Sequence, residues 1–247
     1  VIGCRDPFAA VNGKGIEQLR LAGVEVITDV LHEQCRHLNR RFFTFHEKKR
    51  PYVILKWAQS ADGFMDIDRT SGQVGSFMIS SVDTQALVHS WRAQEAAILV
   101  GKNTFLNDNP SLTVRKATGR NPLRVVLSSA YIDLSGSRLN TPEAPTLVVT
   151  NATDRMDGLV RYVACGNVHE PANVLQCLHK ENVLSILIEG GAQVITSFLK
   201  SGLWDEARII TSEEWLGSGL KAPVLAGPMP IEQLSGTDVI RTFFNKD

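Results

Sequence analysis

The stretch Ala96-Ala97-Ile98-Leu99-Val100-Gly101-Lys102-Asn103-Thr104-Phe105-Leu106-Asn107-Asp108-Asn109-Pro110-Ser111-Leu112-Thr113-Val114-Arg115 decides the fold. It begins with an apolar run of the length of a buried strand, reaches a glycine, and then offers Thr104, Asp108 and Arg115. In open α/β sheets, ligands gather beyond the carboxyl ends of the strands, where helix N-termini and loop amides converge. The stretch therefore predicts a buried strand with a ligand site after it.

A second segment repeats this pattern. The apolar run 184–188 ends in Glu189-Gly190-Gly191, and a helix is expected over residues 192–201. Glycines let a backbone approach a ligand closely, and unpaired amides at a helix start attract phosphate oxygens. Two such corners could hold a dinucleotide, although a tight structural turn is the better explanation of a Gly-Gly taken alone. Neither corner matches the G-x-G-x-x-G or G-x-x-x-x-G-K-[ST] signature.

The rest of the chain alternates strand and helix patterns. We expect an irregular loop over residues 64–74, helices over 84–94 and 171–181, and strands over 52–58, 123–127, 146–150, 160–164, 206–211 and 238–244. This alternation indicates an α/β layered domain.

Residues 1–45 form a separate pattern of strand, helix, strand and helix. The strands are expected over residues 1–4 and 24–28, and the helices over 15–22 and 29–43, with Asp29 as a possible N-cap. Such a unit is too small to fold alone, and the chain begins inside a strand-like run, so we expect a piece of a longer protein. The polar run before Pro51 places a domain boundary between residues 1–46 and 47–247.

Composition excludes several classes of partner. The 247 residues carry 26 Lys plus Arg and 26 Asp plus Glu, so nothing in the charge suggests a nucleic-acid or membrane partner. No apolar run is long enough to cross a bilayer, and no signal-peptide pattern is visible. Four scattered cysteines without a C-x-x-C pair fit reduced core thiols in a cytoplasmic protein.

Single polar residues are ambiguous when taken alone. Lys56 interrupts an apolar strand, where a lysine either snorkels to solvent, finds a partner or takes part in chemistry. Arg92 lies in the last turn of a predicted helix, where a favourable dipole interaction is a sufficient explanation. The six histidines show no H-E-x-x-H or H-x-E pattern and no serine lies in G-x-S-x-G, so we expect no hydrolytic set and no metal site.

Six ordered motifs stand out along the chain. They are Pro51-Tyr52-Val53-Ile54-Leu55-Lys56-Trp57-Ala58-Gln59-Ser60-Ala61-Asp62-Gly63, Ile79-Ser80-Ser81, Trp91-Arg92-Ala93, Val100-Gly101 with Thr104, Asp108-Asn109-Pro110 with Leu112-Thr113-Val114-Arg115, and Ile188-Glu189-Gly190-Gly191. Together they resemble one family, the reductase domain of bifunctional riboflavin-biosynthesis deaminase/reductases. The resemblance extends from about Pro51 to the end of the chain, and residues 1–45 resemble the last part of that family's deaminase domain.

The resemblance implies a fold and a reaction. The fold is a dihydrofolate-reductase-like domain with a central, mostly parallel mixed sheet flanked by helices, preceded by a small α/β remnant of a cytidine-deaminase-like domain. The reaction is the NADPH-dependent reduction of the ribosyl group of 5-amino-6-(5-phosphoribosylamino)uracil to a ribityl chain. Hydride delivery to an opened sugar needs a nearby proton, an anchored phosphate and a dry nicotinamide pocket. Fold analogy further suggests a homodimer.

The resemblance also implies the site residues. Lys56 and Asp108 become the polar pair at the reacting centre. Arg92 and Arg115 suit the substrate phosphate because of their planar donor forks. The implied substrate contacts are Ser76, Arg92, Leu112, Arg115 and Glu189, and the implied cofactor contacts are Ala58, Met78, Thr104, Asp108, Gly191, Ala192, Gln193, Val194, Ile195, Thr196 and Ser197.

Two departures from the family pattern leave alternatives open. Met78 stands where the family commonly has tryptophan, which replaces a stacking contact by an apolar one. The His-x-Glu and paired cysteines of the zinc deaminase are absent, so the deaminase reaction is not assigned to this chain. The alternatives are a supporting fragment of a zinc deaminase, a non-catalytic nucleotide-binding module, or another dihydrofolate-reductase-like reductase.

Overall fold

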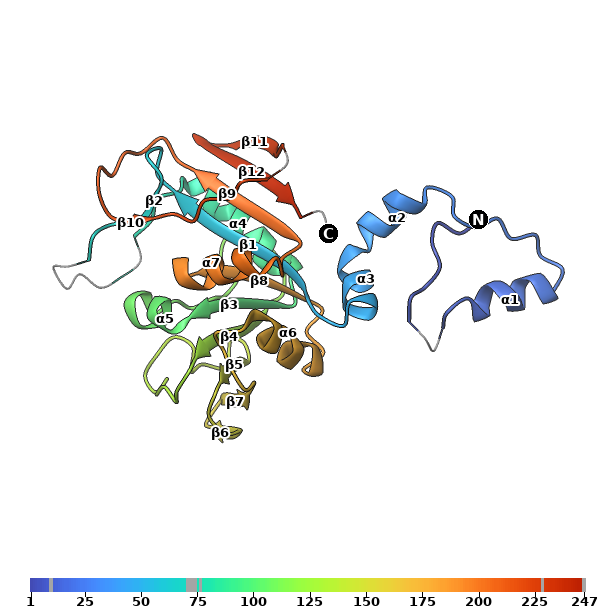
Figure 1. Ribbon diagram of the computed structural model, residues 1–247, viewed down its shortest axis with the longest axis horizontal. Coiled ribbons are helices and arrows are strands. Elements are labelled where there is room, and N and C mark those ends of the chain that lie inside the picture. Colours follow the sequence, from blue (N-terminus) through green and yellow to red (C-terminus); the bar gives the residue numbers. More distant parts are fainter. Residues whose placement is uncertain (9–10, 70–74, 76, 228, 246–247) are drawn as a thin grey trace.

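The computed structural model describes the chain except residues 9–10, 70–74, 76, 228 and 246–247 (Figure 1). Its helices are α1 (Lys14–Leu21), α2 (His32–Leu38), α3 (Arg40–Glu47), α4 (Val82–Gln94), α5 (Lys102–Asp108), α6 (Pro171–Lys180) and α7 (Ala192–Ser201). Its strands are β1 (Tyr52–Gln59), β2 (Phe64–Asp66), β3 (Ala97–Gly101), β4 (Leu123–Ser128), β5 (Thr146–Thr150), β6 (Arg155–Asp157), β7 (Val160–Ala164), β8 (Ser185–Gly190), β9 (Glu206–Thr211), β10 (Leu220–Lys221), β11 (Ile231–Ser235) and β12 (Asp238–Phe244).

One large sheet organises the described residues. Its order is β11-β12-β9-β1-β8-β3-β4-β5-β7-β6, and β2 and β10 form a separate two-stranded sheet. The strands from β9 to β7 run parallel, whereas β12, β11 and β6 add antiparallel edges. The expected α/β class with a mostly parallel mixed sheet is therefore confirmed.

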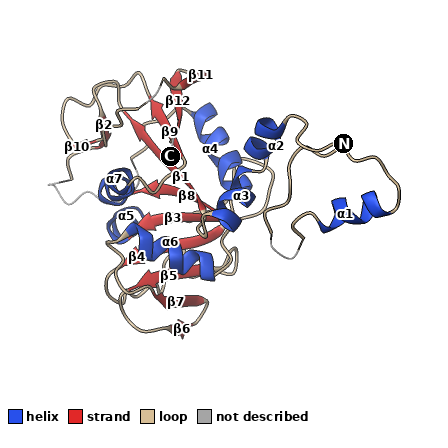
Figure 2. Ribbon diagram, turned by 45° about the vertical axis from the view of Figure 1, so that its right-hand side comes forward, coloured by secondary structure: helices blue, strands red, loops and turns tan. Residues whose placement is uncertain are grey.

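Strand alternation decides which side chains reach the site. On β1, Val53 and Leu55 join the hydrophobic core that contains residues of α6 and α7, whereas Ile54 joins the core that contains Val88 and Trp91 of α4. Helices thus cover both faces of the sheet (Figure 2). Successive side chains on a strand point to opposite faces, so Lys56 lies on the α4 face with Ile54.

The carboxyl ends of β1, β3, β4 and β8 meet at one edge of the sheet because these strands are parallel. α5 begins directly after β3, and α7 begins after the glycine that follows β8. The sheet therefore brings together the two glycine corners that the sequence singled out.

The N-terminal segment differs from expectation. The predicted strands 1–4 and 24–28 are not formed; the two segments share only the bonds Ile2 N–H to Ile27 O, at 2.8 Å, and Val30 N–H to Ile2 O, at 3.3 Å. An isolated pair without a third strand is only marginally stable, which explains the irregular backbone. α1 confirms the helix expected at 15–22, yet none of its residues is buried and it lies far from the sheet (Figure 1).

The single helix expected over residues 29–43 is also wrong. Asp29 and Leu31 have positive φ angles of 64° and 53°, so helical geometry starts only at His32 and Asp29 is not the N-cap. Asn39 then separates α2 from α3, because its side-chain amide donates to the carbonyl of Cys35 at 3.0 Å. Local side-chain bonds of this kind compete with helix continuation.

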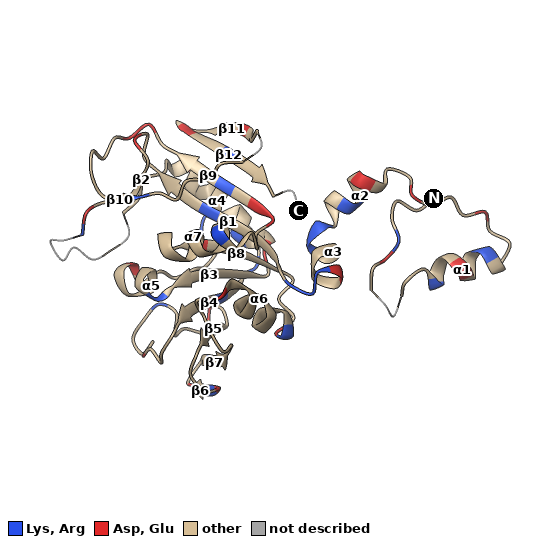
Figure 3. Cartoon of the chain, in the orientation of Figure 1, with Lys and Arg blue, Asp and Glu red and all other residues tan. Residues whose placement is uncertain are grey.

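α3 is tied to the sheet by ion pairs. Arg41 donates to both carboxylate oxygens of Glu95, which is fully buried. After α3, Arg50 forms a two-fold pair with Asp205 at 2.6 and 2.8 Å. Charged residues of both signs occur along α2 and α3 (Figure 3). The segment around the predicted boundary is thus anchored to the main body by charge.

The expected strands and helices of the main domain are confirmed to within two residues at each end. Four short strands were not expected: β2 lies inside the predicted loop 64–74 and pairs with β10, while β6 and β11 are edge strands. Residues 70–74 of that loop lie outside the described residues. Among the described residues, no helix is long and apolar enough to cross a membrane.

Candidate active site

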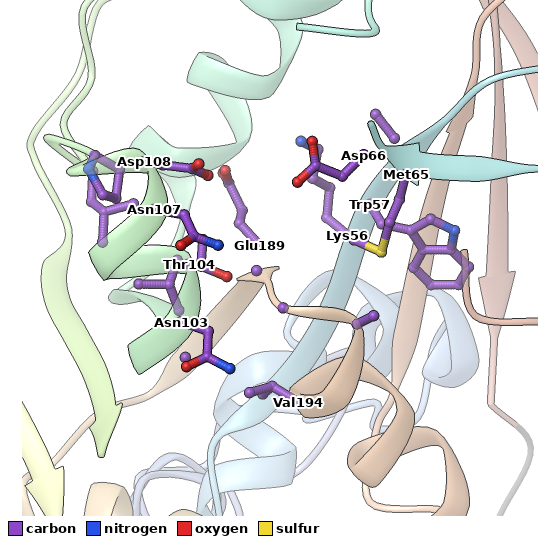
Figure 4. A pocket seen from close by; sticks show the side chains of 18 of the residues that line it. Lys56, Trp57, Met65, Asp66, Asn103, Thr104, Asn107, Asp108, Glu189 and Val194 are labelled. Atoms are coloured by element: carbon purple, nitrogen blue, oxygen red, sulfur yellow. The ribbon is translucent and has the colours of Figure 1, made fainter. Parts of the chain in front are cut away.

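A cavity of about 950 Å³ opens at the carboxyl edge of the sheet. Its walls come from β1, α4, the β3 to α5 corner, the β8 to α7 corner and the turn that carries Leu112 and Arg115. Figure 4 shows Asn103, Thr104 and Asp108 on one wall, and Lys56 and Asp66 on the opposite wall. Segments far apart in the sequence thus form one site.

Most of the predicted site residues line this cavity. The residues that line it are Lys56, Ala58, Met78, Arg92, Thr104, Asp108, Leu112, Arg115, Glu189, Gly191, Ala192, Gln193, Val194 and Ser197. Ile195 does not, since its side chain is fully buried in the core between α7 and the sheet. Thr196 also does not line it, and Ser76 lies outside the described residues.

Glu189 sits between two cations on the α4 face of the sheet. Leu55 pairs with Ile188, so Lys56 and Glu189 follow one step later on adjacent strands. Arg92 donates from Nε to Glu189 Oε1 at 2.8 Å and from Nη2 to Oε2 at 2.6 Å. Although burial alone raises the pKa of Glu189, Arg92 and Lys56 lower it to about 2. Glu189 is therefore a carboxylate at neutral pH.

Lys56 keeps its amine inside the cavity instead of snorkelling to solvent. Burial lowers the pKa of the Lys56 ammonium, the Glu189 carboxylate raises it, and Arg92 lowers it further. A lysine whose pKa is lowered can give or take a proton more readily near neutral pH. The surroundings of Lys56 are thus compatible with a role in the reaction.

Asp108 belongs to a different group of charges. Its Oδ1 lies 3.5 Å from Nη2 of Arg69, and Arg69 in turn donates to both carboxylate oxygens of Asp66. Burial raises the pKa of Asp108, Arg69 lowers it and Asp66 raises it. Oδ1 is buried and accepts no hydrogen bond from the described residues. The carboxylate that points into the cavity therefore has an acceptor position to offer a ligand (Figure 4).

The two polar groups expected at the reacting centre face each other across the cavity. Lys56 lies on β1 and Asp108 at the end of α5, with Glu189 of β8 drawn between them (Figure 4). Asp108 is not among the groups that shift the pKa of Lys56. The structure thus brings them into one cavity without making them an ion pair.

The two glycine corners pack against each other. A Cβ on Gly190 would lie 2.8 Å from Cγ2 of Thr104, and a Cβ on Gly101 would lie 2.9 Å from Cγ2 of Val194. Gly191 has a φ of +82°, a left-handed conformation that side chains disfavour. Backbone amides of both corners therefore border the same space, which suits the phosphates of a dinucleotide.

The face of α4 contributes residues that sequence reasoning missed. Gln85, Val88, His89 and Arg92 all line the cavity, and only Arg92 was expected there. His89 is 5% exposed, and its Nδ1 accepts the backbone N–H of Arg115 at 3.0 Å. The spacing i, i+4, i+7 from Gln85 marks one helix face and could have indicated this wall. Arg138 and Arg69 come from loops without any such periodic signal.

Comparison with known proteins places this geometry in a family. The model of the RibD C-terminal domain matches residues 51–241. The riboflavin biosynthesis protein RibD of Aquifex aeolicus is 36% identical over 228 residues, which cover 89% of this chain and 62% of that protein. The chain thus spans less than two thirds of the length of this relative.

A shorter relative and a solved structure agree with this match. The 2,5-diamino-6-ribosylamino-4(3H)-pyrimidinone 5′-phosphate reductase of Aquifex aeolicus is 33% identical over 190 residues, covering 72% of this chain and 84% of that protein. The crystal structure of a deaminase/reductase from Thermotoga maritima superposes with a TM-score of 0.83 at 31% identity, covering 100% of this chain and 71% of the other. The chain therefore belongs to the RibD C-terminal domain family.

Proposed function

We propose that this chain reduces the ribosyl group of 5-amino-6-(5-phosphoribosylamino)uracil to a ribityl chain in riboflavin biosynthesis, with NADPH as the reductant. The observation that carries the proposal is the single cavity that holds Lys56, Asp108, Arg115 and both glycine corners within a matched reductase domain. A similar relative is named as a reductase of a closely related pyrimidinone phosphate.

The residues present fit a dinucleotide. The corner amides around Gly101 and Gly191 suit its phosphates, and the buried Oδ1 of Asp108 offers an acceptor. Ala58, Met78, Thr104 and the start of α7 would hold the cofactor. A bound nicotinamide would supply the hydride. NADPH, as distinct from NADH, is the family's cofactor and is proposed here on that ground alone.

This chain's own residues would orient the sugar and manage protons. Lys56, with its lowered pKa, would exchange a proton at Nζ with the reacting sugar, while Glu189 holds the amine in place. Asp108 would accept a hydrogen bond at Oδ1 on the opposite wall. The buried apolar side chains of Leu112 and Val100 would exclude water from their part of the cavity.

The first prediction tests Asp108. We expect Asp108→Ala to lose turnover by at least about a hundredfold while circular dichroism and melting stay close to wild type, because the side chain is half-buried and caps no helix. The measurement is NADPH oxidation with the deaminated pyrimidine substrate, with the 2,5-diamino compound in parallel. Asp133→Ala, an exposed carboxylate on the loop after β4, is the matched control. Wild-type turnover in Asp108→Ala would remove Asp108 from the mechanism.

The alternatives predict different results. A non-catalytic nucleotide-binding module would bind NADPH and turn over neither substrate. A fragment that supports a zinc deaminase would purify with stoichiometric zinc.

We further propose a homodimer through the sheet edge, because β11 exposes Ile231 (63%) and Leu234 (77%) on an edge strand. Light scattering tests this oligomeric state. A cytoplasmic location is likewise proposed, from the free thiols.

A further inference from the structure

Four of the cations that line the cavity come from α4 and from the loops that follow α5 and β4. They are Arg92, Arg115, Lys116 and Arg138, and among the described residues only Arg92 makes a salt bridge there. Lys116 donates to the Gln85 amide oxygen, and Arg115 donates from Nη1 to Thr113 Oγ1 at 3.1 Å. Cations outnumber the carboxylates that act on them here, and like charges repel one another, so this wall is prepared for an anion.

The guanidinium of Arg92 is already engaged. Nε and Nη2 hold the two oxygens of Glu189, and Nη1 donates to the carbonyl of Thr113 at 3.2 Å. A ligand phosphate at Arg92 would compete with a buried carboxylate whose pKa is held at about 2. The guanidinium groups that are not paired with a carboxylate are those of Arg115 and Arg138.

Arg138 has a fixed backbone and an unpaired side chain. Its N–H donates to Asn109 Oδ1 at 3.1 Å, and its carbonyl accepts from Nη1 of Arg124 at 3.1 Å. Arg124 is fully buried and also holds Thr141 and Ala144. The Arg138 guanidinium makes no hydrogen bond or salt bridge with the described residues, although it lines the cavity. The peptide is therefore positioned in advance and the charge is available.

Arg115 is positioned by His89. Because Nδ1 of His89 accepts the Arg115 backbone N–H at 3.0 Å, the neutral ring carries its proton on Nε2. Burial lowers the pKa of Arg115, and the charges of Arg92 and Arg138 lower it further, whereas the carboxylates of Glu143 and Glu189 raise it. Arg115 and Arg138 line the same cavity.

We propose that Arg138 binds the phosphate of the substrate together with Arg115, whereas Arg92 acts by holding Glu189. The proposal rests on the proposed function, because a phosphorylated sugar is the ligand. Two guanidinium groups approaching one phosphate from different loops would provide charge-assisted contacts and would select the phosphorylated substrate over its dephosphorylated form.

Arg138→Met tests the proposal because it keeps an unbranched apolar stem and removes the charged guanidinium. Calorimetric binding of ribose 5-phosphate, with ribose as the uncharged probe, is measured together with turnover of the phosphorylated and dephosphorylated substrates. We expect ribose 5-phosphate to bind about tenfold more weakly, and KM for the phosphorylated substrate to rise about tenfold at unchanged kcat. Binding of ribose and turnover of the dephosphorylated substrate should not change. Arg155→Met, on the distant edge strand β6, is the control.

The results separate this proposal from the function on which it rests. Wild-type affinity for ribose 5-phosphate in Arg138→Met overturns the proposal, as does failure of the wild-type protein to bind ribose 5-phosphate. An equal loss with the dephosphorylated substrate also overturns it, since the effect would then not depend on phosphate. Binding that depends on Arg138 in a protein without reductase activity would support the phosphate site and refute the proposed reaction.

Discussion

Glu189 is the residue on which the charges of the cavity depend. It lies between Lys56 and Arg92, and its carboxylate is buried. A buried charge is tolerated when its partners neutralise it, and removing one partner leaves an uncompensated ion. Arg92 therefore stabilises the fold by neutralising Glu189, and this role is separate from any contact with a ligand.

The second prediction follows from this pair. We expect Arg92→Met to lower the free energy of unfolding by about 3 kcal/mol, because Glu189 would lose its two-fold partner in a buried site. Arg92→Met with Glu189→Gln should recover part of the loss, since no carboxylate is then left unpaired. Urea unfolding measures both variants. A double variant less stable than Arg92→Met would contradict the account, and Arg155→Met, whose pair is about half exposed, should change stability by less than about 0.5 kcal/mol.

The third prediction concerns His89 and pH. Burial first, and then the charges of Arg92 and Arg115, lower the pKa of His89 from 6.5 to about 4. Between pH 4 and 6.5 the unfolded chain binds more protons at His89 than the folded chain does. The contribution of His89 to the free energy of unfolding is therefore complete above pH 6.5 and is lost as the pH falls towards 4. The free energy of unfolding should fall by about 3 kcal/mol at most through this protonation. In His89→Asn, urea unfolding between pH 4 and 6.5 should show a shallower dependence; an identical slope would refute the assignment.

At the residue scale, the sequence predicts which side chains belong to the site better than it predicts which residues they contact. Lys56 is conspicuous because it interrupts an apolar strand, and Arg92 stands out only through the family resemblance. That Glu189 joins them depends on the register of β1 against β8, which a single sequence does not specify. Arg138 could not be predicted, because only the contacts of Asn109 and Arg124 bring its loop to the cavity.

At the scale of elements, the two glycine corners determine how closely α5 and α7 approach. Gly190 and Gly101 each leave room for a side chain of the other corner, namely Thr104 and Val194. The helix starts are therefore separated by little more than one layer of side-chain atoms. Any added carbon would have to move a helix or a strand end.

The fourth prediction is that Gly190→Ala separates the corners. The new Cβ would lie 2.8 Å from Cγ2 of Thr104 and 3.0 Å from Cγ1 of Val100, so we expect a loss of about 1 to 3 kcal/mol in stability. Stabilisation by added NADPH should also be smaller than in the wild type. Melting curves with and without NADPH measure both effects. Gly15→Ala, where a Cβ would meet no atom within 4 Å, is the control and should not lower the melting temperature.

Elements with strong patterns were predicted well, and those that depend on local side-chain bonds were not. β5, β7, β9, β12 and α7 have the predicted bounds, because apolar runs or periodic spacing define them. The break between α2 and α3 depends on one amide, that of Asn39. β2 and β10 depend on Gly219, whose φ is +138° and whose Cβ would lie 2.2 Å from the carbonyl oxygen of Asp66.

At the scale of the whole molecule, the N-terminal segment contacts the sheet through α3, which packs on β1, and through the ring of His37 in α2, which lies 5.5 Å from that of Phe244 in β12. α1 buries none of its residues, while α3 contributes Arg41 to the buried Glu95. The predicted boundary at residue 46 lies inside α3, one residue before the helix ends, and stays a prediction. Ion pairs, together with the buried Phe43 and the contact of Phe45 with His179, join the segment to the main body.

The fifth prediction compares two deletions. Deletion of residues 1–31 should change the free energy of unfolding by less than about 1 kcal/mol, because α1 has no buried side chain. Deletion of residues 1–49 should cost several kcal/mol, because Glu95 loses Arg41 and remains buried. Denaturant titrations of both shortened proteins give the values. Equal stability of the two would show that α3 is dispensable and would support a boundary at residue 46.

The anchoring of Arg138 also has a practical consequence for engineering. Its peptide is held on either side by Asn109 and Arg124, whereas Ile132 and Leu134 of the preceding stretch are buried in the core. A reporter dye attached at the exposed Ser135, three residues before Arg138, would therefore leave the core intact and would respond to ligand arrival.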